Sequence, residues 1–320
     1  MIEIEGLTKR FGPYTAVANL SLKVAKGEVL GFLGPNGAGK STTMKMITGF
    51  LAPSSGRVSV CGHDVETDEL AAQASIGYLP EGAPAYGDMT ARQFLLFIAE
   101  IRGFKGAAAK ARVAAAVEKT ELAGVLDQPI ETLSKGFKRR VGLAQAILHD
   151  PPVLIMDEPT DGLDPNQKHA VRTLIRGMAA EKAIIVSTHL LEEVEAICTR
   201  AVIIDRGQIV ADGTPSQLLA RSRYHNAVTI ALPAAQRDAA MAKLKALPTV
   251  SAVDVENRAD GTIQFTAFPK NGALPIEDIS ALAVAEKWDV KELHAEAGRL
   301  DEVFRAITTH DAARAKASAA

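Results

Sequence analysis

The segment GPNGAGKST, residues 34–42, is rich in glycine and ends in a lysine and two hydroxyl residues. An apolar strand pattern, EVLGFLG, precedes it, and KSTTMKMITGF follows with the periodicity of a helix that ends at Gly49. This strand, loop and helix context is what a phosphate-binding loop requires, and it disfavours an ordinary glycine-rich turn. The segment therefore predicts a nucleotide site whose loop consists of Gly34, Pro35, Asn36, Gly37, Ala38, Gly39, Lys40, Ser41 and Thr42.

The chemistry of this loop follows from its residue types. Glycines allow successive backbone N–H groups to turn toward the phosphates, Lys40 reaches the outer phosphates, and the Ser41 hydroxyl ligates Mg²⁺. A second buried strand, VLIMDE, ends in Asp157 and Glu158. An Asp-Glu pair alone would fit a solvated loop start, but after a phosphate-binding loop we expect Asp157 to serve Mg²⁺ and Glu158 to polarise the attacking water.

A second anion site is predicted by ETLSKGFKRRVGLAQAI, residues 131–147. Thr132 and Ser134 stand where a helix begins, and Gly136 follows, so a hydroxyl and backbone N–H groups lie at a positive helix end. One nucleotide has no need of two separate cradles. The second site must therefore bind something other than the nucleotide held by the first.

Bulk composition describes an ordinary globular protein and excludes several classes. With 36 basic and 38 acidic side chains the net charge is -2, which does not indicate a nucleic-acid binder. No stretch approaches the roughly 18 uncharged apolar residues of a membrane helix, so we expect a cytoplasmic chain. Cys61 and Cys198 lie far apart without metal-ligand spacing, and we expect both to be reduced.

Changes in pattern along the chain predict its organisation. Residues 1–28 indicate antiparallel strands, residues 83–150 a helical subdomain, and PPVLIMD and KAIIVSTH strands of a parallel sheet. AVIIDRGQIVADG indicates a hairpin. The remaining expected elements are strand 226–232, helix 234–246, strands 250–257 and 261–268, helix 276–286, strand 288–294 and helix 299–309.

These patterns predict an α/β fold with a P-loop NTPase core and a small C-terminal α+β domain of ferredoxin-like order. We expect the nucleotide-binding domain over residues 1–221, the C-terminal domain over 222–310, and a frayed tail over 311–320.

The motifs appear in an order that resembles the ATP-binding subunits of ABC transporters. By that resemblance Phe11 stacks on adenine, with Tyr14 as a rival, unless Phe11 is simply a core residue. Glu81 takes the Q-loop position near Mg²⁺, where it can accept from a metal-bound water. His189 takes the place of the switch histidine, against the alternative of a core histidine. LSKGF, residues 133–137, matches the signature motif, and DGLD, residues 161–164, supplies Asp164 of the D-loop.

The resemblance also answers what the second anion site binds. Two such domains pack head to tail in this family, so Ser134 and Gly136 would contact the nucleotide held by the partner. An ordinary N-cap remains a chemically sound reading of the same residues. Lys135, Phe137 and Glu81 depart from the family's commonest residues, but Ser134 and Gly136 keep the phosphate donors.

The altered signature and the C-terminal extension look most like the ABC-2 exporter branch, which includes drug-efflux and gliding-motility ATPases. This implies an ATPase that binds ATP and Mg²⁺ and pairs as a homodimer or with another ATPase subunit. It would act peripherally at the inner face of the cell membrane on an integral membrane permease, without inserting into the membrane or binding nucleic acid. In the loop after Glu81, Tyr86 and Met89 are the expected docking residues.

Two other functions remain open at this point. A non-transport ABC ATPase of DNA repair or translation typically carries a coiled-coil insertion or two P-loops in one chain, and the sequence has one P-loop and no sustained heptad run. A nucleotide-binding regulatory module without turnover would lack the carboxylate at Glu158.

Overall fold

The structure, a computed structural model, describes residues 1–82 and 85–317. Its backbone contacts divide the chain into two units, Met1–Pro215 and Ser216–Ala320. Each unit has a hydrophobic cluster of its own.

The first unit begins with an antiparallel sheet of strand order β2-β1-β4-β5. Its strands are β1 (Ile2–Phe11), β2 (Tyr14–Val24), β4 (Ser55–Val60) and β5 (His63–Asp64). Ile2 lies opposite Val24 on one side and Val60 on the other. Alternate residues of β1, including Ile2 and Ile4, are buried, as the period-two pattern predicts.

A second sheet of six strands, in the order β10-β9-β3-β8-β7-β6, forms the centre of this unit. Its strands are β3 (Val29–Leu33), β6 (Ile76–Leu79), β7 (Val153–Asp157), β8 (Ala183–Thr188), β9 (Arg200–Asp205) and β10 (Gln208–Gly213). The β9/β10 pair is the predicted antiparallel hairpin, and the other neighbours are parallel. Every residue of β3, β7 and β8 is buried, as expected for strands covered on both faces.

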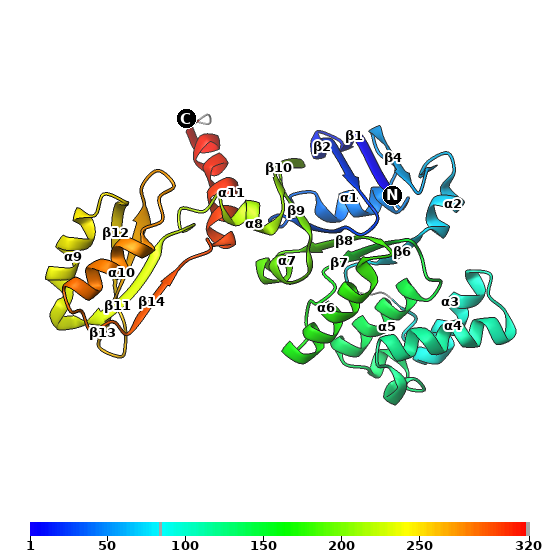
Figure 1. Cartoon of the computed structure of the whole chain (residues 1–320). Coiled ribbons are helices and arrows are strands. Elements are labelled where there is room, and N and C mark those ends of the chain that lie inside the picture. The colour runs from blue at the N-terminus through cyan, green and yellow to red at the C-terminus, as the bar shows by residue number, and fades with distance from the viewer. Residues whose placement is uncertain (83–84, 318–320) are drawn as a thin grey trace. The chain divides into compact units, whose positions relative to one another are not determined.

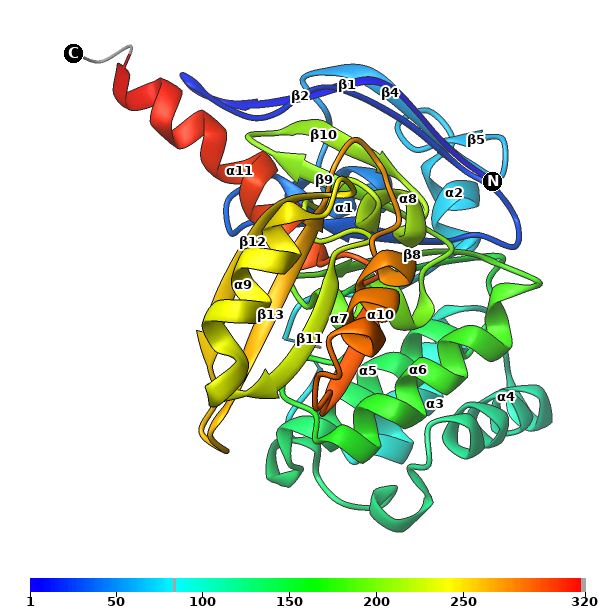
Figure 2. The ribbon, with the colours of Figure 1, turned by 60° about the vertical axis from the view of Figure 1, so that its left-hand side comes forward.

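Helices cover both faces of the central sheet (Figures 1 and 2). Helix α1 (Lys40–Ile47) packs between the two sheets, where Met44 and Ile47 join the hydrophobic cluster of β1, β3 and β7. The other helices of the unit are α2 (Glu69–Ala74), α3 (Ala91–Ile101), α4 (Gly106–Lys119), α5 (Lys135–Ile147), α6 (Pro165–Ala179) and α7 (Leu191–Ile197). Helix α8 (Pro215–Leu219) begins at the last residue of this unit, and its other residues belong to the second unit. Helices α3 to α5, with short 3₁₀ turns at Ala123–Val125 and Ile130–Thr132, form the predicted helical subdomain.

The second unit has a sheet of order β12-β13-β11-β14 in which every neighbouring pair is antiparallel. Its elements are β11 (Val228–Pro233), a 3₁₀ turn at Ala234–Gln236, α9 (Arg237–Ala246), β12 (Val250–Asn257), β13 (Thr262–Pro269), α10 (Ile276–Ala285), β14 (Glu292–Ala295) and α11 (Leu300–Ala317). Helices α9 and α10 bury Leu244 and Ile279 against Phe265 on one face of the sheet. This βαββαβ order is ferredoxin-like.

The predicted fold class is therefore confirmed, with differences at two boundaries. The contacts place the division after Pro215, six residues before the expected boundary at 221. The tail expected to be frayed from 311 is helical to Ala317, because alanine, arginine and lysine favour the helix and extend α11. Residues 83–84, at the start of the expected helical subdomain, and 318–320 lie outside the described residues.

Among the described residues, no helix combines the length and the apolar character that crossing a bilayer requires.

The contact between β6 and α5 depends on a glycine. A Cβ on Gly77 would lie 2.1 Å from the Ala146 carbonyl oxygen, so Gly77→Ala must push the helical subdomain away from the sheet. We expect this change to lower the free energy of unfolding by about 1–3 kcal/mol. Gly177→Ala is the matched control, since Gly177 is an exposed helical residue with open space around it. The control should stabilise by about 0.5–1 kcal/mol. Denaturant unfolding measures both, and an equal effect of the two changes would contradict the close contact.

Candidate active site

The loop between β3 and α1 is held in a conformation that only glycine adopts without strain. Gly39 has φ 105°, and a Cβ there would lie 2.5 Å from the Ala16 carbonyl oxygen. A Cβ on Gly34 would lie equally close, 2.5 Å, to the Ile204 carbonyl oxygen. Side chains are excluded at both positions, and the loop passes directly into the N-terminus of α1, whose free N–H groups favour an anion.

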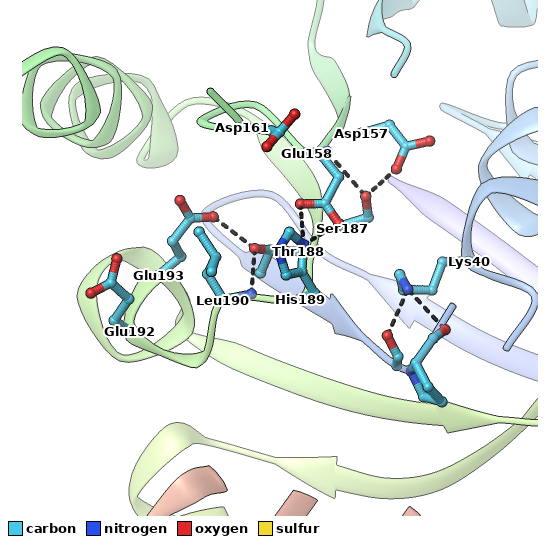
Figure 3. Close-up of polar contacts among 12 residues, drawn as sticks. Lys40, Asp157, Glu158, Asp161, Ser187, Thr188, His189, Leu190, Glu192 and Glu193 are labelled. Atoms are coloured by element: carbon cyan, nitrogen blue, oxygen red, sulfur yellow. Dashed lines mark hydrogen bonds and ion pairs between the residues drawn. The ribbon is translucent and has the colours of Figure 1, made fainter. Parts of the chain in front are cut away.

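Lys40 begins α1 and is nearly buried. Its Nζ donates to the carbonyl oxygens of Gly34 at 2.6 Å and Pro35 at 3.1 Å, so the ammonium lies over its own loop (Figure 3). Burial lowers the pKa of Lys40, while the negative charges of Glu158, Asp157 and Glu81 act in the opposite direction. These three carboxylates keep a positive charge favourable in a partly dry site.

A cavity of about 430 Å³ lies over this loop. It is lined by Phe11, Tyr14, Ala16, Asn36, Gly37, Gly39, Lys40, Ser41, Thr42, Glu81, Asp157 and Glu158. Residues distant in sequence, the predicted loop and the predicted carboxylates among them, thus meet around one volume. Gly34, Pro35 and the buried Ala38 belong to the same loop without lining the cavity.

Two aromatic side chains lie at the rim of the cavity. Phe11 and Tyr14 face each other across the β1/β2 turn and are 49% and 57% exposed. The alternative that Phe11 is a core residue is therefore wrong. Tyr14 donates weakly to the Gly37 carbonyl at 3.4 Å and Lys9 lies over the Phe11 ring at 5.3 Å, so both rings remain candidates to stack on a base.

Asp157 ends β7 and Glu158 follows it directly, and the two side chains differ in environment. Asp157 is 2% exposed, and its carboxylate accepts from the Ser187 hydroxyl of β8. Glu158 has φ 52°, a left-handed backbone that is strained for a residue with a side chain. Its N–H donates to the Ser187 carbonyl at 3.1 Å and contacts the Ser187 hydroxyl at 3.2 Å. At this turn the Asp157 carboxylate contacts Ser187, whereas the Glu158 carboxylate contacts His189.

His189 follows β8 directly and pairs with Glu158. Its Nδ1 lies 3.0 and 2.9 Å from the two carboxylate oxygens of Glu158 (Figure 3). Because a carboxylate only accepts, Nδ1 must carry the hydrogen. The His189 side chain is 55% exposed, so the alternative of a core histidine is wrong.

Thr188, the residue before His189, is held by two hydrogen bonds. Its hydroxyl donates to Glu193 at 2.8 Å and accepts from the Leu190 N–H at 3.0 Å. Burial raises the pKa of Glu193, although this hydrogen bond and Arg172 act against it. The end of β8 that carries His189 is thus fixed by buried hydrogen bonds.

Ser134, Gly136 and Asp164 lie apart from the cavity lining. Ser134 is the N-cap of α5, and its hydroxyl accepts from the Phe137 N–H at 3.3 Å. A Cβ on Gly136 would lie 2.5 Å from Oε1 of Gln167. Asp164 is the N-cap of α6 and accepts from the Gln167 N–H at 2.9 Å, which is a structural role in the single chain.

The oxygen donors at the cavity suit Mg²⁺ bound together with phosphates. Among the described residues no cluster of three or more His, Cys, Asp or Glu side chains could hold a metal by itself. Mg²⁺ typically takes one or two protein oxygens and completes its shell with phosphate and water, so the Ser41 hydroxyl and the Asp157 carboxylate fit it.

The sequence analysis did not identify two residues that fix Asp157 and Glu158 in position. Ser187 binds both Asp157 and Glu158, and Arg139 of α5 donates to the backbone carbonyls of the same two residues. Ser187 lies in the apolar strand β8, two residues before His189. A serine in such a buried strand needs a hydrogen-bond partner, and that was the signal available in the sequence. Arg139 was hidden in a basic run that reads as a solvated helix face.

Comparisons with known proteins agree with this geometry. An ABC transporter family model matches residues 17–161. Nod factor export ATP-binding protein I of Paraburkholderia xenovorans is 40% identical over 220 residues, which are 68% of this chain and 72% of that protein. The linearmycin resistance ATP-binding protein of Bacillus subtilis is 38% identical over 222 residues, 69% of this chain and 71% of that protein.

A solved structure gives the same result. A structure described as the ATP-binding subunit of an ABC transporter matches with a TM-score of 0.64 at 30% identity, over 68% of this chain and 91% of that one. A phosphate-binding loop and two carboxylates around one cavity, and a histidine that pairs with one of these carboxylates, lead with these relatives to one assignment. The chain belongs to the ABC transporter family and is an ATP-binding, ATP-hydrolysing subunit of exporter type.

Proposed function

We propose that this chain works in a head-to-tail dimer, with a second copy or a paired ATPase subunit, whose closure on two Mg-ATP drives an integral membrane permease of the ABC-2 exporter branch. The observation that carries the proposal is the separation of Ser134 and Gly136 from the cavity that holds Lys40 and Glu158. Within one chain the two anion sites do not meet among the described residues. A partner in the opposite orientation would bring them together.

The predicted site residues have separate roles in this proposal. Lys40 and the loop N–H groups bind the outer phosphates, and Phe11 or Tyr14 stacks on adenine. Ser41 and Asp157 would hold Mg²⁺, with Glu81 accepting from its water, and the ion would neutralise phosphate charge. Glu158 would orient the attacking water, and His189, which contacts the Glu158 carboxylate, would also contact the terminal phosphate.

Transport is favoured over the alternative in DNA repair or translation. The relatives described above are named for Nod factor export and for linearmycin resistance. We infer that the chain acts at the inner face of the cell membrane through contact with a permease, as an exporter ATPase.

The first prediction from this proposal concerns Glu158. Glu158→Gln keeps the shape of the side chain but removes the negative charge that polarises water, so hydrolysis should fall by roughly 10²-fold or more. ATP binding should remain, and Mg-ATP should then trap the dimer. Steady-state ATPase assays and size-exclusion chromatography with and without Mg-ATP measure both effects, and wild-type turnover in the variant would remove Glu158 from the mechanism.

The second prediction concerns the trans arrangement. A Ser134→Arg subunit mixed with a Lys40→Ala subunit confines both lesions to one composite site and leaves the other intact. The mixed dimer should hydrolyse ATP faster than either variant alone. Differently tagged subunits allow the mixed species to be isolated. Activity no higher than that of the two parents would contradict two independently working trans sites.

A cleft of about 670 Å³ between the core and the helical subdomain is our candidate for permease docking. Its lining includes Phe50, Leu70 and Ile101, which are 73%, 83% and 64% exposed. Large exposed apolar side chains around a hollow are typical of a protein contact. Tyr86 packs edge-on against Phe94 and Phe97, and neither Tyr86 nor Met89 is among the residues that line the cleft. We therefore prefer the cleft residues to Tyr86 and Met89 as docking candidates.

The third prediction tests this cleft. Leu70→Ser combined with Ile101→Ser removes apolar contact area but no core side chain, so basal ATPase should stay within about twofold. Recovery of the permease from detergent extracts with the tagged ATPase should fall about tenfold or more. Leu274→Ser in the second unit, 62% exposed, is the matched control and should leave recovery unchanged. Equal recovery with the double variant and the control would place docking elsewhere.

A further inference from the structure

Arg139 is a buried arginine that connects three parts of the site. It lies in α5, five residues after Ser134, and is 5% exposed. Its guanidinium donates to the Pro80 carbonyl at 3.1 Å and to the carbonyls of Asp157 and Glu158. The acceptors are all backbone carbonyl oxygens. Arg139 therefore fixes the position of the main chain and donates no hydrogen bond to a carboxylate of the residues that the structure describes.

Two of these acceptors belong to the strained turn that carries the catalytic carboxylate. The peptide on one side of Glu158 is held through its N–H by Ser187, and Arg139 holds the carbonyls on both sides. A residue with φ 52° persists only where its surroundings fix it. Ser187 and Arg139 supply that fixation together with the Asp161 N–H, which donates to the Glu158 carbonyl at 3.1 Å.

The third acceptor extends the connection to the loop of Glu81. Pro80 directly precedes Glu81, which lines the cavity. The planar guanidinium presents several donors in a fixed fork, and a single ammonium group cannot reproduce that spread. One side chain of α5 therefore ties together the loop of Glu81 and the end of β7.

We infer that Arg139 is a positioning residue through which the helix that begins at Ser134 sets the Glu158 carboxylate of the same chain. The inference rests on the proposed function, because it assigns Ser134 to the partner's nucleotide and Glu158 to the chain's own. Helix α5 then touches one nucleotide at its N-terminus and governs hydrolysis of the other through Arg139. The two composite sites of a dimer are linked by one helix in each subunit.

The test compares Arg139→Lys and Arg139→Met with Arg140→Lys in the full-length chain. Arg140 is the next residue of α5 and pairs with Glu121 at 2.8 Å, outside the cavity. We expect Arg139→Lys to lower kcat about tenfold and Arg139→Met to lower it further, with KM for ATP within about twofold. The control should keep wild-type kcat, and thermal melting verifies that each variant is folded.

A double-mutant cycle separates positioning from general damage to α5. If Arg139 acts through Glu158, adding Arg139→Lys to Glu158→Gln should not slow the residual single-turnover hydrolysis further. The same double variant should still form the ATP-dependent dimer. Additive losses, or a lost dimer, would mean that Arg139 supports the helix and not the carboxylate, and would overturn the inference.

Failure of the inference and failure of the proposed function give different results. A mixed Ser134→Arg and Lys40→Ala dimer without restored activity would contradict the proposed head-to-tail arrangement. An active wild type with Arg139→Lys indistinguishable from Arg140→Lys would contradict the role of Arg139 alone.

Discussion

Repulsion among like charges is the constraint on which this site depends. Asp157, Glu158 and Glu81 all face the cavity over the phosphate-binding loop, where a polyphosphate would add further negative charge. At short range and low dielectric, such charges cannot be gathered without compensation. Lys40 and the N-terminus of α1 supply compensating positive charge at the phosphate-binding loop. Arg139 supplies a buried positive charge at the end of β7. Burial lowers the pKa of both cations, and the surrounding carboxylates act against that shift.

The fold provides this arrangement through the central sheet. Strands β3, β7 and β8 are adjacent and parallel, so the loop after β3, the carboxylates at the end of β7 and the histidine after β8 emerge at one edge of the sheet. Complete burial of these strands fixes their register, and register sets the distance between Glu158 and His189. Hydrophobic packing far from the chemistry thus determines a contact between two polar side chains.

The sequence predicted those parts of the fold and the site in which a residue type has a single common structural role. Glycines that must admit close backbone contact, apolar runs of covered strands, and carboxylates after such a run predicted the loop, the sheet and most of the cavity lining. Arg139 could not be found in this way, because a basic residue in a helix is usually solvated and only the tertiary structure shows its carbonyl partners. Asp164 was assigned to the nucleotide by resemblance, whereas the structure shows the local N-cap that aspartate also favours.

The two hydrophobic clusters have a consequence for cooperativity. One cluster draws its buried residues from Ile2 to Ile204 and the other from Val228 to Ala283, with no residue in common. Each unit therefore has its own source of stability, and a single two-state transition is not the natural description of this chain. We expect a denaturation curve to contain the unfolding transitions of both units, either one after the other or overlapping. The nucleotide site and the C-terminal unit therefore need separate probes in a denaturation experiment.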